Sequence, residues 1–171
     1  MLGLRASGKS LVGRLLAQQF DRPFWDSDVQ LAARLGAEKS AGEHLQAFGE
    51  ARFRREEWQT LFELLERPEL SVVASGGGAV ASPFSRELLG RRSTGVYLRT
   101  GLDVLRARAE ASDEFRPDLY RGGTKLDLEQ QLTIREPLYL QLASLVIDTD
   151  SAKADEIALS LADQLQSRGL V

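Results

Sequence analysis

A glycine-rich phosphate-binding motif stands at the start of the chain. Residues 3–10 spell GLRASGKS, which fits the P-loop pattern G-x-x-x-x-G-K-S. Backbone N–H groups at such a turn, closed by the N-terminus of a helix, form a cradle for a polyphosphate. Lys9 would bring positive charge to the β- and γ-phosphates, and the Ser10 hydroxyl would be a ligand for Mg²⁺. The motif therefore predicts nucleotide binding at a strand–loop–helix junction.

The helix after the motif is well supported, whereas the strand before it is not. Apolar residues recur at helical spacing after Gly8, at Leu11, Val12, Leu15, Leu16 and Phe20. Only Met1 and Leu2 precede Gly3, which is too short a run for a strand of ordinary length. We therefore expect the first strand of the fold to be missing or truncated.

Composition limits the classes of function that remain. The 171 residues suit a single domain, and a net charge of −3 argues against a sequence-independent nucleic-acid binder. The chain has no cysteine and one histidine, His44, so disulfides, thiolate metal sites and a zinc site are excluded. No apolar run approaches the ~20 residues that span a bilayer, and no signal peptide is recognisable. We expect a cytoplasmic protein with no membrane and no nucleic-acid partner.

Short apolar runs alternate with longer helical patterns along the chain. We predict strands at 23–25, 70–74, 94–98 and 145–147, and helices at about 9–20, 28–35, 50–66, 83–89, 101–110, 126–143 and 152–167. This alternation predicts an α/β fold in three layers, α/β/α, with a mostly parallel central sheet. Polar and glycine-rich residues follow the strands, at the sheet edge where α/β proteins bind ligands.

One segment departs from this pattern. Residues 111–125, ASDEFRPDLYRGGTK, are polar and contain Pro117 and two adjacent glycines. The segment is either a plain surface loop or a mobile lid that closes over bound nucleotide. In a lid, Arg116 and Arg121 would be available for phosphate.

Asp26 and Asp28 follow the predicted strand at 23–25. If the strand continued to Asp28, its two-residue period would place both carboxylates on one face, toward the P-loop. One carboxylate could hold Mg²⁺ through water and the other could accept a proton from a substrate hydroxyl. The alternative is helix capping, in which Ser27 or Asp28 caps a helix that begins near Val29.

Two further groups of residues could bind an anionic substrate. Arg54 and Glu57 are three residues apart on a predicted helix, so they can pair, and a fixed guanidinium suits capture of a carboxylate. The alternative is a solvated charged face. The run SGGGAV at 75–80 follows a predicted buried strand and would let a ligand lie against bare backbone. Pro137 would kink the helix at 126–143 and could aim Arg135 inward, unless Arg135 is an ordinary surface arginine.

Taken together, these motifs resemble the shikimate kinases, small P-loop kinases related to the nucleoside monophosphate kinases. The resemblance covers nearly the whole chain, and its parts occur in the family's order. The matching segments are GLRASGKS at 3–10, DSD at 26–28, GEARFRREE at 49–57, SGGGAV at 75–80, RPDL at 116–119 and REPLY at 135–139.

The resemblance implies a role for each matching residue. Nucleotide would be held by Gly3, Ala6, Gly8, Lys9, Ser10, Leu11, Arg108 and Arg116, and Mg²⁺ by Ser10 and, through water, by Asp26. Shikimate would be held by Asp28, Arg54, Gly77, Gly78 and Arg135. Catalysis would fall to Asp28, which orients or deprotonates the hydroxyl, together with Lys9 and Arg116.

The resemblance also implies the overall reaction and organisation. The chain would transfer the γ-phosphoryl group of ATP to the 3-hydroxyl of shikimate, as one domain over 1–171 with a lid at about 111–125 and a substrate-binding helical segment at about 28–66. We expect a monomer. The first strand is normally central in this fold, so its absence would remove two ladders unless something else fills the place. Two other functions stay open: another small-metabolite kinase, such as gluconate kinase, and a non-catalytic ligand-sensing domain.

Overall fold

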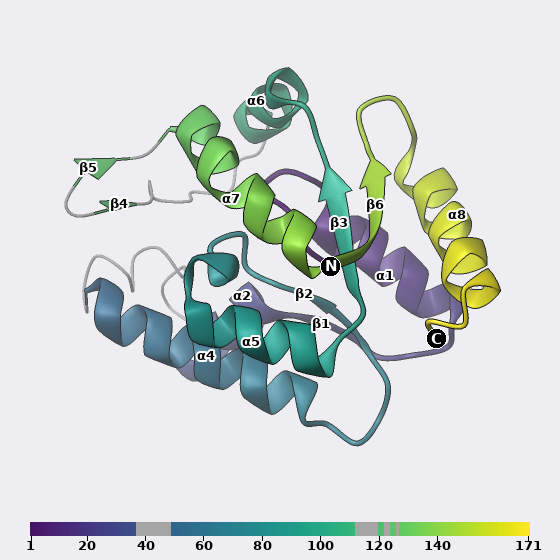
Figure 1. Ribbon diagram of the computed structural model, residues 1–171, viewed down its shortest axis with the longest axis horizontal. Helices are drawn as coiled ribbons and strands as arrows, with labels where there is room; N and C mark the ends of the chain where they lie inside the picture. The colour runs from purple at the N-terminus through teal and green to yellow at the C-terminus, as the bar shows by residue number, and fades with distance from the viewer. Residues whose placement is uncertain (37–48, 112–119, 122–123, 126) are drawn as a thin grey trace.

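The computed structural model describes residues 1–36, 49–111, 120–121, 124–125 and 127–171. Figure 1 shows its helices and strands. In chain order they are α1 (Lys9–Gln19), β1 (Phe24–Asp26), α2 (Ser27–Arg34), α4 (Glu50–Leu65), β2 (Val72–Ala74), the short 3₁₀ helix η1 (Ala79–Ala81), α5 (Pro83–Arg92), β3 (Gly95–Arg99), α6 (Leu102–Glu110), β4 (Tyr120–Arg121), β5 (Thr124–Lys125), α7 (Leu128–Leu142), β6 (Ala143–Asp148) and α8 (Ala154–Ser167).

Within the described residues, the parallel strands are arranged as two hydrogen-bonded pairs. β1 pairs with β2, and β3 pairs with β6. A separate antiparallel pair, β4 with β5, lies inside the segment predicted to be a loop or lid. Parallel pairing with helices between the strands confirms the predicted α/β fold. The predicted helices and strands agree with the observed ones within about three residues at each end.

Met1 and Leu2 join the two pairs of strands into one sheet. On one side, the Met1 amine donates to the carbonyl of Val73, and the Ser75 N–H donates to the carbonyl of Met1. On the other side, the Leu2 N–H donates to the carbonyl of Val96. The Leu98 N–H in turn donates to the carbonyl of Leu2, which forms a parallel bridge with Tyr97.

Met1 and Leu2 therefore lie at the place where the sequence analysis expects the first strand. These two residues lie between β2 and β3, near the carboxyl edge of the sheet. Their hydrogen bonds fix the register of β2 relative to β3. The P-loop begins immediately after them, so it starts at the carboxyl edge of the sheet although almost no strand precedes it.

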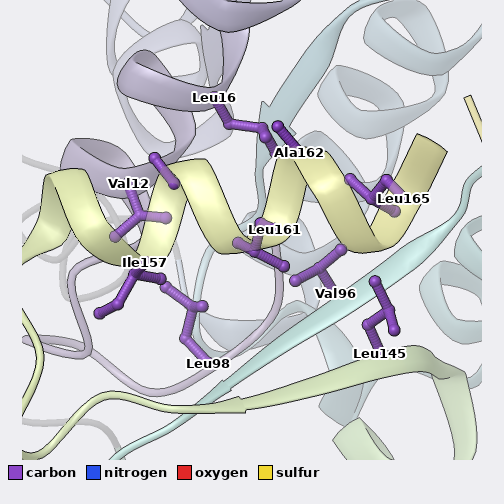
Figure 2. Close-up of a cluster of buried hydrophobic side chains, with 10 residues drawn as sticks. Val12, Leu16, Val96, Leu98, Leu145, Ile157, Leu161, Ala162 and Leu165 are labelled. Carbon is purple, nitrogen blue, oxygen red and sulfur yellow. The ribbon is translucent and has the colours of Figure 1, made fainter. Parts of the chain in front are cut away.

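Each face of the sheet is covered by helices that bury apolar side chains. On one face α1 and α8 pack over β3 and β6 (Figure 1), and Figure 2 shows the resulting cluster, which includes Val12, Leu16, Val96, Leu98, Leu145, Ile157, Leu161 and Leu165. On the other face Leu2, Leu4, Val80, Leu89, Tyr97, Leu105 and Tyr139 form a second cluster. Neighbouring residues of β3 thus serve opposite faces, as the two-residue period of a strand requires. Among the described residues, no helix is long and apolar enough to cross a membrane.

The N-terminal amine lies in an unusual place for a charged group. Although the Met1 residue as a whole is partly exposed, its amine lies inside the sheet against the Val73 carbonyl. Burial there, with a smaller contribution from the positive charge of Lys9, lowers the pKa of the amine from 8.0 to about 5. The folded protein therefore favours the neutral amine near pH 7.

We expect the free energy of unfolding to decrease as the pH falls from about 8 to about 5. Across this interval the unfolded chain, whose amine has a pKa near 8, binds more protons than the folded chain. The decrease amounts to a few kcal/mol at most, since each pKa unit corresponds to about 1.4 kcal/mol.

Urea unfolding followed by tryptophan fluorescence at pH 5, 6.5 and 8 measures this dependence. The control is the same protein acetylated at the Met1 nitrogen, which cannot titrate and should therefore lose less stability over the interval. Identical pH dependence of the two proteins would contradict the assignment.

Candidate functional site

The P-loop has the backbone conformation and the helix that a phosphate cradle needs. Ala6 and Gly8 have positive φ angles of 63° and 89°, and Gly8 is the N-cap of α1. No side chain caps this helix end, and the N-terminus of a helix favours an anion such as phosphate. Leu11, predicted to contact nucleotide, lies in the first turn of α1 and is exposed.

Lys9 bonds within the loop, whereas Ser10 bonds to the neighbouring strand β1. The Lys9 side chain is buried, and its Nζ donates to the carbonyl of Leu4 at 2.7 Å, so the ammonium lies within the loop. The Ser10 Oγ donates to Oδ2 of Asp26 at 2.5 Å. The structure thus brings together the hydroxyl and the carboxylate that were predicted to share a metal ion.

Asp26 bonds both to Ser10 in α1 and to the start of α2. While its Oδ2 accepts from Ser10, its Oδ1 accepts from the backbone N–H of Asp28 at 3.0 Å and of Val29 at 3.4 Å. Asp26 is therefore the N-cap of α2, and the prediction that Ser27 or Asp28 caps the helix was wrong. The capping fixes the carboxylate that faces the P-loop.

Asp28 reaches the site by a different route from the one predicted. β1 ends at Asp26 and α2 begins at Ser27, so the two carboxylates are not related by a strand period. Asp28 instead lies in the first turn of α2, where its Oδ1 would be 2.5 Å from a Cβ on Gly76. The Gly76 N–H donates to the Ser27 Oγ at 2.8 Å, which holds α2 against the triple-glycine loop, residues 76–78.

Arg54 and Glu57 form the predicted ion pair on α4. The Arg54 Nη1 lies 2.8 Å from the Glu57 Oε2, and the two side chains are 17% and 4% exposed, so the alternative of a solvated charged face was wrong. Glu50 adds a longer contact, 3.8 Å from the Arg54 Nε. The Arg54 guanidinium crosses the third glycine so closely that a Cβ on Gly78 would be 2.9 Å from Nη1.

Burial sets the electrostatics of this cluster. Desolvation raises the pKa of Glu57, and the nearby negative charge of Asp28 adds to the effect, while Arg54 opposes it. On the other side of the cluster, desolvation lowers the pKa of Arg135, and repulsion from Arg54 contributes. Two guanidinium groups that are close together and short of solvent favour an anionic ligand between them.

Arg135 points inward from α7, as predicted, and is buried. Its Nη1 donates to the carbonyl of Gly77 at 3.3 Å and to the Gln131 Oε1 at 3.2 Å. Pro137 lies within α7 and does not end the helix. The prediction that Arg135 is an ordinary surface arginine is therefore excluded.

The middle glycine connects α7 to the P-loop. The Tyr139 hydroxyl donates to the Gly77 carbonyl at 2.5 Å, alongside Arg135. On its other side Gly77 lies directly on the P-loop, because a Cβ there would be 3.2 Å from the Arg5 nitrogen and from the Gly3 carbonyl oxygen. The triple-glycine loop thus lies between the phosphate cradle and the acidic and basic side chains of α2, α4 and α7.

Three residues of this arrangement were not singled out from the sequence. Tyr139 was quoted as part of REPLY and Ser27 as part of DSD, but neither was given a role at the site. Gln131 lies one helical turn before Arg135, and this i to i+4 spacing is the signal that could have found it.

Most of the predicted lid, at about 111–125, lies outside the described residues. Arg116 and His44 lie outside the described residues, and only the backbone of Arg121 is described, in β4. Arg108 lies in the last turn of α6 and donates from Nη2 to the Thr149 carbonyl at 2.8 Å, at the end of β6. This contact places Arg108 at the carboxyl edge of the sheet.

The geometry suits transfer of a phosphoryl group to an anionic alcohol. A phosphate cradle lies on one side of the triple-glycine loop, and a carboxylate and two guanidinium groups lie on the other. Phosphoryl transfer needs mainly positioning and neutralisation of charge, and these groups can supply both.

The chain is similar in sequence and fold to shikimate kinases. The family model for shikimate kinase matches residues 5–166. The shikimate kinase of Burkholderia pseudomallei (strain 1710b) is 39% identical over 170 residues, which cover 99% of this chain and 90% of that protein. A solved structure of shikimate kinase from Acinetobacter baumannii in complex with shikimate has a TM-score of 0.88 and 33% identity, and covers 99% of this chain and 93% of that one. Shikimate kinase from Bacteroides thetaiotaomicron has a TM-score of 0.82 and 30% identity, and covers 99% and 97%.

We expect Gly77→Ala to lower the free energy of unfolding by about 1–3 kcal/mol, the usual cost of forcing an extra methyl group into packed surroundings. The atoms that the new Cβ would meet are backbone atoms of the P-loop, which cannot rotate away. Gly90→Ala is the control, because its Cβ would meet only Leu142 Cδ2, at an ordinary 3.5 Å, on the exposed side of α5. Urea unfolding of both variants measures the difference, and equal stabilities would contradict the close packing of Gly77.

Proposed function

Because the chain belongs to the shikimate kinase family, we propose that it transfers the γ-phosphoryl group of ATP to the 3-hydroxyl of shikimate. The observation that carries the proposal is the convergence of Asp28, Arg54 and Arg135 on the triple-glycine loop that lies on the P-loop. The donor and acceptor sites are thereby brought next to each other.

In this proposal two arginines bind the acceptor's carboxylate. Arg54 is held by Glu57, and Arg135 is held by Gln131 and the Gly77 carbonyl, so both guanidinium groups are oriented before the acceptor arrives. Oriented guanidinium groups can make paired hydrogen bonds to a carboxylate. Gly77 and Gly78 would line the acceptor site, where side chains would occupy the space.

Asp28 would orient the attacking hydroxyl and accept its proton. Its position in the first turn of α2 is fixed by the Asp26 cap and by the Ser27 bond to the triple-glycine loop. A carboxylate at hydrogen-bond distance from a substrate hydroxyl is the arrangement that general base catalysis requires.

We propose that the nucleotide and Mg²⁺ bind at the P-loop. The backbone from Gly3 to Gly8 and the side chain of Lys9 would hold the phosphates. The donor set of Ser10 Oγ and Asp26 Oδ2 fits Mg²⁺, which binds through oxygen and usually keeps several waters. When bound, the ion supplies neutralisation of charge on the phosphate oxygens.

The remaining predictions stay part of the proposal. Arg116 would contact the transferred phosphate, Arg108 would pack on adenine, and a lid at about 111–125 would close over the site and exclude water. We further propose that the protein is one domain that acts as a monomer in the cytoplasm, with no nucleic-acid or membrane partner.

A coupled ADP-release assay with shikimate, with gluconate and without acceptor tests the function. We expect release that depends on ATP, Mg²⁺ and shikimate. Release with gluconate alone would favour another small-metabolite kinase, and no acceptor-dependent release would favour a ligand-sensing domain. Phosphorus NMR of the product identifies the oxygen that carries the phosphoryl group.

We expect Asp28→Asn to lower kcat by about 10²–10⁴-fold, the range for loss of a general base, with little change in thermal stability. The matched control is Asp163→Asn, an exposed aspartate of α8 that belongs to no part of the site. Steady-state kinetics and thermal unfolding of both variants provide the comparison. A kcat for Asp28→Asn within twofold of the parent enzyme would remove this residue from the proposed role.

Replacing Arg54 by Gln should raise KM for shikimate about 10–100-fold, since a hydrogen bond to a charged group contributes about 1.5–3 kcal/mol. KM for ATP should change little, because Arg54 lies on the acceptor side of the loop. The control Arg55→Gln changes the next residue of α4, which is exposed. If both variants changed KM for shikimate equally, the proposed carboxylate contact would be wrong.

A further inference from the structure

Tyr139 is a buried polar residue to which the proposed reaction gives no role. On one face of α7 the buried residues Gln131, Arg135 and Tyr139 follow one another at intervals of four residues. The Tyr139 side chain is 0% exposed, and its hydroxyl donates to the Gly77 carbonyl at 2.5 Å. The hydroxyl thus reaches the triple-glycine loop from the same helix face as the Arg135 guanidinium.

Tyr139 and Arg135 share one hydrogen-bond acceptor. The Gly77 carbonyl accepts from the Tyr139 hydroxyl at 2.5 Å and from the Arg135 Nη1 at 3.3 Å. Hydrogen bonds from N–H to oxygen in proteins are usually about 2.7–3.2 Å long, so the Arg135 bond is a long one. Tyr139 is therefore the closer donor to this carbonyl, and the Arg135 bond is the weaker of the two.

The surroundings of Tyr139 keep its hydroxyl protonated and in place. Burial raises the pKa of the hydroxyl above 10.0, and the positive charge of Arg135 opposes only part of that rise. At neutral pH the hydroxyl is therefore a hydrogen-bond donor. The ring is stacked on Tyr97, with the ring centroids 5.1 Å apart and an angle of 26° between the ring planes. This packing fixes the position from which the hydroxyl donates to Gly77.

A carboxylate bound by Arg135 would compete with the Gly77 carbonyl for the same N–H groups. The bonds of Arg135 to the Gly77 carbonyl and to the Gln131 Oε1 both start from Nη1, at 3.3 and 3.2 Å. Both of these acceptors are uncharged. A guanidinium pairs more strongly with a carboxylate than with an uncharged oxygen, because the carboxylate also carries charge. Binding of an anionic acceptor would therefore weaken the bond of Arg135 to Gly77.

We propose that Tyr139 is a positioning residue for the acceptor: its hydroxyl keeps the Gly77 carbonyl hydrogen-bonded when Arg135 shifts from that carbonyl to the acceptor's carboxylate. This inference rests on the proposed function, in which Arg135 binds that carboxylate. Without the hydroxyl, Arg135 is the donor on which the carbonyl depends. Binding of the acceptor would then leave the carbonyl without a partner, which costs free energy and weakens binding.

Two variants that each lose one tyrosine hydroxyl test this proposal. Tyr139→Phe removes the bond to Gly77 and keeps the buried ring and its stacking on Tyr97. Tyr97→Phe is the matched control, because Tyr97 is also buried and its hydroxyl donates to the Glu136 Oε1 at 3.2 Å rather than to the triple-glycine loop. Loss of stability alone should affect the two variants alike. Steady-state kinetics with shikimate and ATP, together with thermal unfolding, compare them.

We expect Tyr139→Phe to raise KM for shikimate about 5–100-fold, the range for a polar group left without its partner, and to change KM for ATP less than about twofold. Tyr97→Phe should change both values less than about twofold. In a protein that already carries Arg135→Met, the Gly77 carbonyl has the same donors with and without acceptor, so Tyr139→Phe should add less than about twofold to KM for shikimate.

Each possible result bears on the proposal. Equal effects of the two phenylalanine variants on KM for shikimate would overturn it, and so would fully additive effects of Tyr139→Phe and Arg135→Met. A parent enzyme without shikimate-dependent ADP release would overturn the proposed function, and this inference with it. Release by the parent enzyme together with equal phenylalanine variants would overturn this inference alone.

Discussion

The backbone hydrogen bonds of Met1 and Leu2 hold the two halves of the sheet together. In the part of the chain that the structure describes, these two residues connect β1 and β2 to β3 and β6 by backbone hydrogen bonds. The site depends on this link. The P-loop follows Leu2 directly and the triple-glycine loop follows β2, so a shift of β2 along the central residues would move one loop past the other. The bonds of Met1 and Leu2 therefore help to set how the nucleotide side faces the acceptor side, together with the contact of Gly77 with the P-loop backbone.

The triple-glycine loop is the second feature that fixes the geometry of the site. Its three positions face three different parts of the site: Asp28 at Gly76, the P-loop backbone at Gly77 and the Arg54 guanidinium at Gly78. Close approach on all three explains why side chains are absent there. Buried charge surrounds the loop, and desolvation shifts the pKa values of Glu57 upward and of Arg135 downward. Such a cluster costs free energy in the absence of a ligand, and an anionic ligand would offset part of that cost.

The sequence predicted the order of elements and the composition of the site better than the local geometry. Helical spacing and buried strands were sufficient to place the main helices and strands, and the pairing of Arg54 with Glu57 followed from their spacing. The route of Asp28 to the site did not, because a three-residue motif at a strand end does not reveal where the strand stops and the helix starts. The bond from Tyr139 to Gly77 joins residues far apart in the chain, so no local pattern could indicate it. The bridging role of Met1 and Leu2 likewise depends on tertiary contacts.

A crystal structure with shikimate and ADP bound tests the central claim most directly, namely that the triple-glycine loop brings an acceptor site against the P-loop. The account predicts the shikimate carboxylate between Arg54 and Arg135, a ring hydroxyl within hydrogen-bond distance of Asp28, and the ADP phosphates at the N-terminus of α1. Shikimate bound elsewhere, or bound with its carboxylate away from both arginines, would contradict it.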